Sequence, residues 1–253
     1  MPRYFIRFSY DGTLYHGWQI QPGDVSVQEV MTERMKCLFG ADFSLTGAGR
    51  TDAGVHAASM WAHFDLPEAL DDPKALISRL NRMLPDDIAV QDVRPVRDGA
   101  HARFDAVSRT YEYRFTLKKD PFARLCATPL NTLPDVDAMQ QAADILKEYT
   151  DFTSFSKLHT DVKTNNCRIM RADWQRRGDL LVFTVQADRF LRNMVRAIVG
   201  TLLEVGRGKL SPDGLRAVIE KKDRCAAGQS MPPQGLFLTD VAYPEDLFLT
   251  PGD

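Results

Sequence analysis

The sequence has few of the residues and spacings that mark a metal-binding or disulfide-stabilised protein. Its 253 residues include four cysteines and five histidines, with no Cys-x-x-Cys or His-Glu-x-x-His spacing among them. We therefore expect no bound metal. The cysteines are widely scattered, and we expect them to be reduced core residues rather than members of disulfides: Cys37, Cys126, Cys167 and Cys225.

Long apolar runs and an N-terminal targeting segment are also missing. No run approaches the ~18 apolar residues of a membrane-spanning helix, and Met1–Arg7 lacks the basic region and apolar core of a secretory signal. We therefore expect a cytoplasmic protein with no membrane segment. With 44% apolar residues, the chain is long enough to fill two hydrophobic cores.

A net positive charge is absent as well, since the formal net charge is −2. The charges are unevenly distributed, however. Residues 157–209 hold eleven Lys and Arg against five Asp and Glu, which gives +6 and leaves −8 for the remainder. Such a stretch can bind the phosphates of a polyanion such as RNA. The alternative is that these charges are the solvated faces of a hairpin and a helix.

The most informative feature that is present is the decapeptide Gly47–His56, which reads Gly-Ala-Gly-Arg-Thr-Asp-Ala-Gly-Val-His. Its glycines permit a tight turn, and its small residues leave space around Asp52, which stands close to Arg50. A flat molecule could therefore reach the carboxylate. An ordinary hairpin turn remains an alternative. A dinucleotide fingerprint and a phosphate loop are excluded, because Asp52 stands where a glycine is needed and no Gly-Lys-Ser/Thr follows.

The spacing of apolar residues predicts an internal repeat. Alternation at Tyr4, Ile6 and Phe8 is typical of a strand, and Ser26 with Glu29 forms a capping box that opens a helix. Both halves follow the order β-α-β-β-α-β of a ferredoxin-like unit. The first half has strands at 3–10, 43–47, 57–65 and 88–95, and helices from 26 and at 73–83. The second has strands at 107–117, 167–175, 180–187 and 236–243, helices at 135–148 and 190–205, and an extra helix from 211.

Several motifs resemble those of the tRNA pseudouridine synthase A family, in the family's order and over residues 3–243. They are the decapeptide itself, Tyr10-Asp11-Gly12, Tyr15-His16-Gly17-Trp18-Gln19, Ser26-Val27-Gln28-Glu29, His101-Ala102-Arg103-Phe104, Tyr111-Glu112-Tyr113, Asp151-Phe152-Thr153-Ser154-Phe155 and the stretch from Phe190 to Arg196. The chain departs from the family at Ser230–Gln234, where the family usually reads Ala-Pro.

The resemblance implies an α/β (α+β) fold. Two ferredoxin-like halves, 1–105 with the Asp loop and 106–253 with the Tyr strand and the basic helix, would form one continuous, mixed and mainly antiparallel sheet. Helices would lie on one side of this sheet, around a central cleft. It also implies that uridine is isomerised to pseudouridine at positions 38, 39 and 40 in the anticodon arm of tRNA, by a homodimer. Substrate and product are isomers, so no cofactor is expected.

The resemblance assigns the role of nucleophile to Asp52. We expect Arg196 to form an ion pair with it, because a guanidinium keeps a neighbouring carboxylate ionised and oriented. Tyr111 is expected to stack on the uracil or to transfer a proton near C5, although periodicity alone fits Tyr113 equally well. Arg50 is placed to enter the base stack when the uridine swings out. The further residues expected to contact the substrate are Thr51, His56, Arg103 and Arg192.

Two other functions remain open at this point. A non-catalytic RNA-binding module on the same fold would explain the basic stretch and the aromatic residues. A hydrolase that uses Asp52 is disfavoured, because no histidine or second carboxylate lies close to Asp52 in the sequence to activate water.

Overall fold

The chain divides into two compact units. The computed structural model describes residues 1–157 and 164–249. Unit 1 consists of residues 1–107 and the C-terminal residues from 238, and unit 2 of residues 108–237. The division after residue 107 lies close to the expected boundary after 105. The expectation that all later residues belong to the second half is wrong, because the C-terminal residues pack with unit 1.

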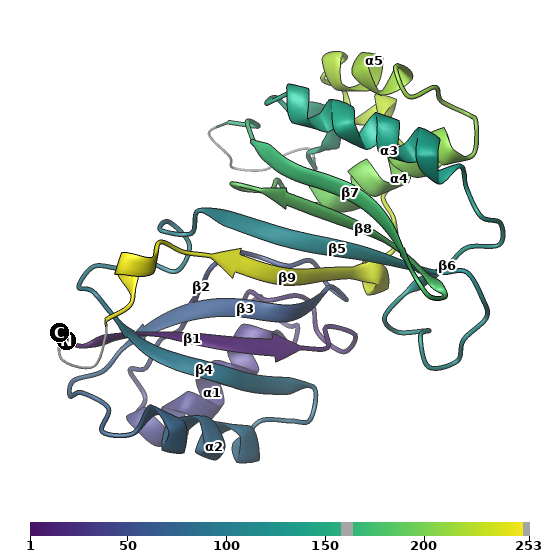
Figure 1. Cartoon of the computed structure of the whole chain (residues 1–253). Coiled ribbons are helices and arrows are strands. Elements are labelled where there is room, and N and C mark those ends of the chain that lie inside the picture. The colour runs from purple at the N-terminus through teal and green to yellow at the C-terminus, as the bar shows by residue number, and fades with distance from the viewer. Residues whose placement is uncertain (158–163, 250–253) are drawn as a thin grey trace. The chain divides into compact units, whose positions relative to one another are not determined.

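Unit 1 is a mainly antiparallel sheet with two helices (Figure 1). Its strand order is β4-β1-β3-β9, with β2 paired to β3. Strand β1 is antiparallel to both β3 and β4. The β-α-β-β-α-β order predicted for the N-terminal half is therefore confirmed. Its elements are β1 (Arg3–Tyr10), α1 (Val27–Phe39), β2 (Thr46–Gly47), β3 (His56–Asp65), α2 (Pro73–Met83), β4 (Ile88–Val96) and β9 (Leu236–Ala242).

One face of the unit 1 sheet packs against α1. The rings of Phe39 in α1 and Phe64 in β3 have centroids 6.2 Å apart, and Phe64 lies 5.7 Å from Tyr4 in β1. Helix α1 buries Met31 and Met35, which are four residues apart on one side of the helix. The predicted capping box of Ser26 and Glu29 is present at the start of this helix. Local sequence and core packing thus favour the same element.

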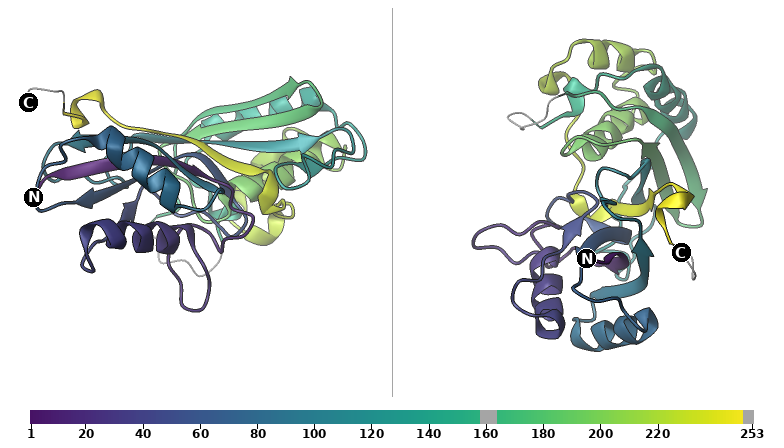
Figure 2. Two further views of the ribbon diagram at one scale, coloured as in Figure 1. Left: turned by 90° about the horizontal axis from the view of Figure 1, so that it is seen from below. Right: turned by 90° about the vertical axis from the view of Figure 1, so that its left-hand side faces the viewer.

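The opposite face of the unit 1 sheet is covered by the C-terminal residues, as Figure 2 shows for the segment that follows β9. The ring of Phe5 lies 5.1 Å from Tyr243 and 6.0 Å from Phe248, and Trp61 lies 5.8 Å and 5.6 Å from the same two rings. Aromatic contacts of this kind contribute beyond their buried area. This aromatic cluster is the physical reason why the C-terminal residues belong to unit 1.

Unit 2 is built from three long strands in the order β5-β8-β7, with the short β6 parallel to β5. Helices α3 and α4 pack closely, since a Cβ on Gly206 of α4 would stand 2.6 Å from the sulfur of Met139 in α3. None of the described helices is long and apolar enough to cross a membrane. The elements are β5 (Ser108–Thr116), β6 (Thr128–Pro129), α3 (Val136–Ile145), β7 (Ile169–Arg177), β8 (Leu180–Ala187), α4 (Met194–Gly206) and α5 (Gly214–Glu220).

Three expectations need correction. Helix α4 begins at Met194 rather than at 190, because Asn193 takes a left-handed backbone conformation with φ 67°, which ends the preceding turn. Strand β2 has two residues instead of five. Of the four cysteines, all of which are free, Cys167 alone is buried, while Cys37 and Cys225 are exposed.

Candidate active site

Asp52 lies on the loop between β2 and β3, which is closed by backbone hydrogen bonds. At its start, Ala48 N–H donates to Trp61 O of β3 over 2.8 Å, and at its end Val55 N–H donates to Asp52 O over 3.1 Å. Gly54 takes a φ of 75°, a left-handed conformation that favours glycine. The loop is therefore a defined turn, and Asp52 occupies a fixed position within it.

This loop, residues 48–55 and called the Asp52 loop below, is also bonded to the segment between β1 and α1. Trp18 N–H donates to Thr51 O over 3.4 Å, and Gly54 N–H donates to Tyr15 O over 3.2 Å. The hydroxyls of Tyr10 and Thr51 are 2.8 Å apart. The two tyrosines and the tryptophan belong to motifs found in the sequence, for which sequence reasoning assigned no role. Their role in the structure is to hold the loop of Asp52.

Two glycines allow this segment to approach the loop. A Cβ on Gly17, whose φ is 88°, would stand 2.3 Å from Thr51 O, and a Cβ on Gly12 would stand 2.0 Å from Val55 O. Neither position has room for a side chain, because the contacting atoms belong to the backbone. The glycines of the Tyr10–Gly12 and Tyr15–Gln19 motifs thus serve to pack this segment against the Asp52 loop.

His56 is buried directly behind the loop, with 2% of its surface exposed. Its Nδ1 lies 3.1 Å from the N–H of Gly12 and 3.0 Å from Oδ1 of Asp11. Burial opposes ionisation of Asp11, but hydrogen bonds from Thr13 and the nearby His56 together lower the pKa of this carboxyl. His56 thus joins the start of β3 to the segment that follows β1, whereas a direct contact with the substrate remains a prediction.

The side chains at the turn are more accessible. Asp52 and Thr51 are half-buried, and Arg50 is exposed. Within the described residues, no three His, Cys, Asp or Glu side chains gather in a group that could hold a metal ion. The Asp52 loop thus offers a carboxylate in a rigid turn with an exposed guanidinium two residues away.

In unit 2, the structure distinguishes the two tyrosines of β5. Tyr113 is fully buried, and its hydroxyl lies 2.6 Å from Oγ1 of Thr128 and donates to Pro232 O over 2.7 Å. Burial raises its pKa to about 12. Tyr111 is half-buried, and its ring meets Phe190 edge-on, with centroids 5.1 Å apart. Tyr113 is therefore a core residue, and Tyr111 keeps a partly open face.

Arg196 lies in the first turn of α4 and is half-buried. Its Nε donates to Met231 O over 2.6 Å, and Met231 N–H donates to Arg196 O over 3.1 Å. Arg192 is exposed and precedes the helix, so the prediction of a helix over 190–205 is wrong at this residue. The helix and the 230–232 segment together orient the Arg196 guanidinium.

The segment that departs from the family pattern is thus tightly bonded. Ser230 accepts a hydrogen bond from Asn193 over 2.6 Å and another from Arg224 over 2.7 Å. Met231 and Pro232 contribute backbone carbonyls, which residues of other types could also supply. Most contacts of this segment are therefore made by backbone atoms and do not depend on which side chains stand there.

Arg103 has different surroundings. It follows β4 in a loop fixed by Ala102 N–H, which donates to Nδ1 of His63 over 3.2 Å, and by the Arg3 side chain, which donates to Ala100 O over 2.8 Å. Its guanidinium lies 5.6 Å from the ring of Phe104. Arg3 begins β1, whereas Tyr10, which contacts the Asp52 loop, ends it. The contacts that fix Arg103 within unit 1 are therefore not those that fix Asp52.

Comparison with known proteins identifies the family. The family model described as tRNA pseudouridine synthase matches residues 7–105 and 146–244. Proteins named tRNA pseudouridine synthase A are similar over nearly their whole length. The protein from Parabacteroides distasonis is 58% identical over 248 residues, with 98% of each chain covered. The one from Bacteroides thetaiotaomicron is 56% identical over 251 residues, covering 98% of this chain and 93% of the relative. The one from Bacillus subtilis is 41% identical over 239 residues, covering 93% and 96%. The chain therefore belongs to the tRNA pseudouridine synthase family.

Proposed function

We propose that the protein isomerises uridine to pseudouridine in tRNA, with Asp52 as the nucleophile. The observation that carries this proposal is the near full-length similarity to relatives named tRNA pseudouridine synthase A. It is supported by the position of Asp52 in a hydrogen-bonded turn with small neighbours. The same similarity favours an enzyme over a non-catalytic RNA-binding module.

The proposed reaction breaks the bond between C1′ and N1 of uridine and forms a bond between C1′ and C5, after which C5 loses a proton and N1 takes one up. Asp52 attacks either C1′ or C6 and holds that fragment while the uracil turns. Because no atom is gained or lost, the reaction requires no cofactor. A rigid loop suits this role, since a displacement of ~1 Å in a reacting group can cost ~100-fold in rate.

Three further residues complete the proposed site. Arg196 pairs with the Asp52 carboxylate and keeps it ionised. Tyr111 stacks on the uracil or exchanges a proton near C5. Arg50, which is exposed, enters the base stack as the uridine leaves it.

The substrate proposed here is the anticodon stem-loop of cytoplasmic tRNA, at positions 38, 39 and 40, bound by a homodimer. Modification of three adjacent positions requires recognition of RNA shape and backbone more than of base sequence. The basic stretch of residues 157–209 supports contacts with phosphates.

Substitution of Asp52→Asn tests the proposal. It should abolish pseudouridine formation in tRNA, mapped before and after incubation, while tRNA affinity stays within a few-fold. Asp42→Asn, which changes an exposed carboxylate of the same unit, is the matched control and should keep full activity. Turnover by Asp52→Asn would reject the nucleophile, and a wild-type protein that binds tRNA without modifying it would favour the RNA-binding module.

Arg196→Lys tests the ion pair separately. Lysine keeps the positive charge but loses the planar, bidentate geometry of the guanidinium. We expect turnover to fall at least ~10-fold with little change in tRNA affinity, in single-turnover assays. An unchanged rate would contradict the proposed pairing.

A further inference from the structure

The loop between β4 and β5 exposes the aromatic ring of Phe104, for which the proposed reaction has no role. The side chain of Phe104 is 72% exposed, whereas Ala102, two residues earlier, is fully buried. A single exposed phenylalanine needs no explanation by itself. This ring, however, is held in place by the residues around it.

Ala102 anchors the loop to the rest of unit 1. Its N–H donates to Nδ1 of His63 over 3.2 Å, and its carbonyl oxygen accepts a hydrogen bond from the hydroxyl of Tyr243 over 2.6 Å. The outer part of the loop is closed by His101, whose N–H donates to Asp105 Oδ2 over 2.7 Å. A loop fixed in this way loses little conformational freedom when a ligand binds to it.

Phe104 is the last of a row of side chains that begins in the buried part of unit 1. The ring centroids of His63 and His101 are 4.6 Å apart, and those of His101 and Phe104 are 4.3 Å apart. The guanidinium of Arg103 lies 5.6 Å from the centroid of the Phe104 ring, and the Arg103 N–H donates to Nδ1 of His101 over 3.1 Å. Proteins bind the bases of single-stranded RNA on aromatic rings and guanidinium planes of this kind.

The pair of Arg103 and Phe104, called the Arg–Phe pair below, is remote from the Asp52 loop. The side chain of Arg3, the first residue of β1, donates to Ala100 O at the start of the loop, whereas Tyr10, the last residue of β1, contacts the Asp52 loop. The ends of this eight-residue strand are roughly 20 Å apart. A nucleotide at the Arg–Phe pair is therefore a different one from the uridine at Asp52.

We propose that the Arg–Phe pair binds an unpaired nucleotide of the tRNA, remote from the target uridine. The base stacks on the ring of Phe104, and the phosphate of the nucleotide contacts the Arg103 guanidinium. A base inside a duplex has both faces covered by its neighbours, so only an unpaired base can stack on a ring from outside. The inference rests on the proposed action on tRNA, and it does not depend on the role of Asp52.

Equilibrium binding of tRNA to the full chain tests the stacking contact. Phe104→Ala should weaken binding about 10-fold, while the single-turnover rate at saturating tRNA stays unchanged because the site is remote from Asp52. Phe104→Leu keeps an apolar side chain but has no aromatic face, so it should behave like Phe104→Ala. Phe104→Trp should bind at least as tightly as the wild type. Wild-type affinity of Phe104→Leu would indicate a general apolar contact and would overturn base stacking.

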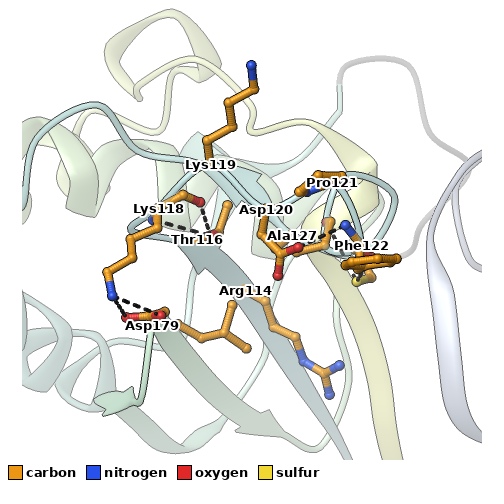
Figure 3. Close-up of a pocket in the computed structure, with 12 residues that line it drawn as sticks. Arg114, Thr116, Lys118, Lys119, Asp120, Pro121, Phe122, Ala127 and Asp179 are labelled. Carbon is orange, nitrogen blue, oxygen red and sulfur yellow. Dashed lines mark hydrogen bonds and ion pairs between the residues drawn. The ribbon is translucent and has the colours of Figure 1, made fainter.

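Phe122→Ala is the matched control. Phe122 is 94% exposed in unit 2, where it lines a cavity together with residues of its own loop and of β5 (Figure 3). Its replacement should leave tRNA affinity unchanged. An equal loss of affinity in Phe122→Ala and Phe104→Ala would mean that any exposed ring contributes, and would overturn the proposed site.

Photo-crosslinking identifies the nucleotide. With p-benzoylphenylalanine in place of Phe104, the protein should cross-link to an unpaired nucleotide of the tRNA outside the target positions. Cross-links confined to paired nucleotides, or to the target uridine and its immediate neighbours, would overturn the proposal.

The outcomes separate this inference from the proposed reaction. Wild-type tRNA affinity of Phe104→Ala would reject the Arg–Phe pair as a binding site and leave the isomerase reaction untouched. Turnover by Asp52→Asn would reject the nucleophile, whereas weaker tRNA binding by Phe104→Ala would still support the site. A wild-type protein without affinity for tRNA would overturn both.

Discussion

At Gly17 and Gly23, the backbone takes the same left-handed conformation in two different environments. Their φ values are 88° and 85°, but a Cβ on Gly17 would meet Thr51 O at 2.3 Å, whereas a Cβ on Gly23 would meet nothing within 4 Å. Alanine at either position carries a similar backbone cost of about 1 kcal/mol. We predict that Gly17→Ala, by displacing the loop of Asp52, lowers turnover at least ~100-fold. Gly23→Ala should keep turnover, and equal losses in pseudouridine assays of both variants would refute the prediction.

His63 makes stability depend on pH. Burial, helped by the charges of Arg3 and His101, lowers the pKa of His63 to about 4. The unfolded chain, with a His pKa near 6.5, then binds a proton below that pH that the native protein excludes. We predict that stability falls as pH drops from 6.5 towards 4, and that His63 accounts for roughly 2 to 3 kcal/mol of the loss between pH 7 and 4.5.

Urea unfolding at the two pH values measures this effect. His63→Asn keeps an acceptor where Nδ1 receives the Ala102 N–H, but cannot titrate, so its stability should depend less on pH. His16→Asn, at an exposed position, is the control and should behave like the wild type. A variant whose pH dependence equals that of the wild type would contradict the assignment.

At the level of the elements, two serine hydroxyls accept hydrogen bonds near the start of a helix. The loss of each hydroxyl should affect activity differently. Ser26 caps α1, accepting the Glu29 N–H over 3.2 Å, and Ser230 holds the segment that bonds Arg196. We predict that Ser26→Ala costs about 1 kcal/mol of stability and leaves turnover unchanged. Ser230→Ala should cost a similar amount and also lower turnover several-fold. Thermal unfolding and pseudouridine assays of the two variants measure the contrast, and an equal activity of both would show that Ser230 does not position Arg196.

The elements that the sequence predicts well are those with explicit local signals. Helix α2 spans Pro73–Met83 as expected, because Asp72 caps it and Pro73 opens it. The start of α4 could not be predicted, since Asn takes the left-handed conformation only occasionally and the sequence does not show that Asn193 does so. Periodicity likewise could not separate Tyr111 from Tyr113, because the difference between them depends on Thr128 and Pro232, which lie far along the chain.

For the whole molecule, the distribution of charge makes a prediction about RNA affinity. The side chain of Arg168 is exposed, and its guanidinium has no carboxylate partner among the described residues. The guanidinium of Arg171, in contrast, pairs with Asp173. If the basic stretch binds phosphates, log K for tRNA falls linearly with log salt. Arg168→Gln should reduce that slope by about one, and Arg171→Gln by less. Filter binding of tRNA at salt concentrations from about 50 to about 300 mM tests this prediction. Identical slopes for the wild type and the two variants would indicate that the basic stretch is a solvated surface that does not bind RNA phosphates.

The Phe5, Trp61, Tyr243 and Phe248 cluster has a consequence for biosynthesis. The ribosome makes the chain from its N-terminus onwards. The segment with Tyr243 and Phe248, which covers Phe5 of β1, is therefore made only after all of unit 2. During translation the bare aromatic side of the N-terminal sheet is open to aggregation and to chaperones. The unit that carries Asp52 is thus completed only after unit 2, once Tyr243 and Phe248 have been made.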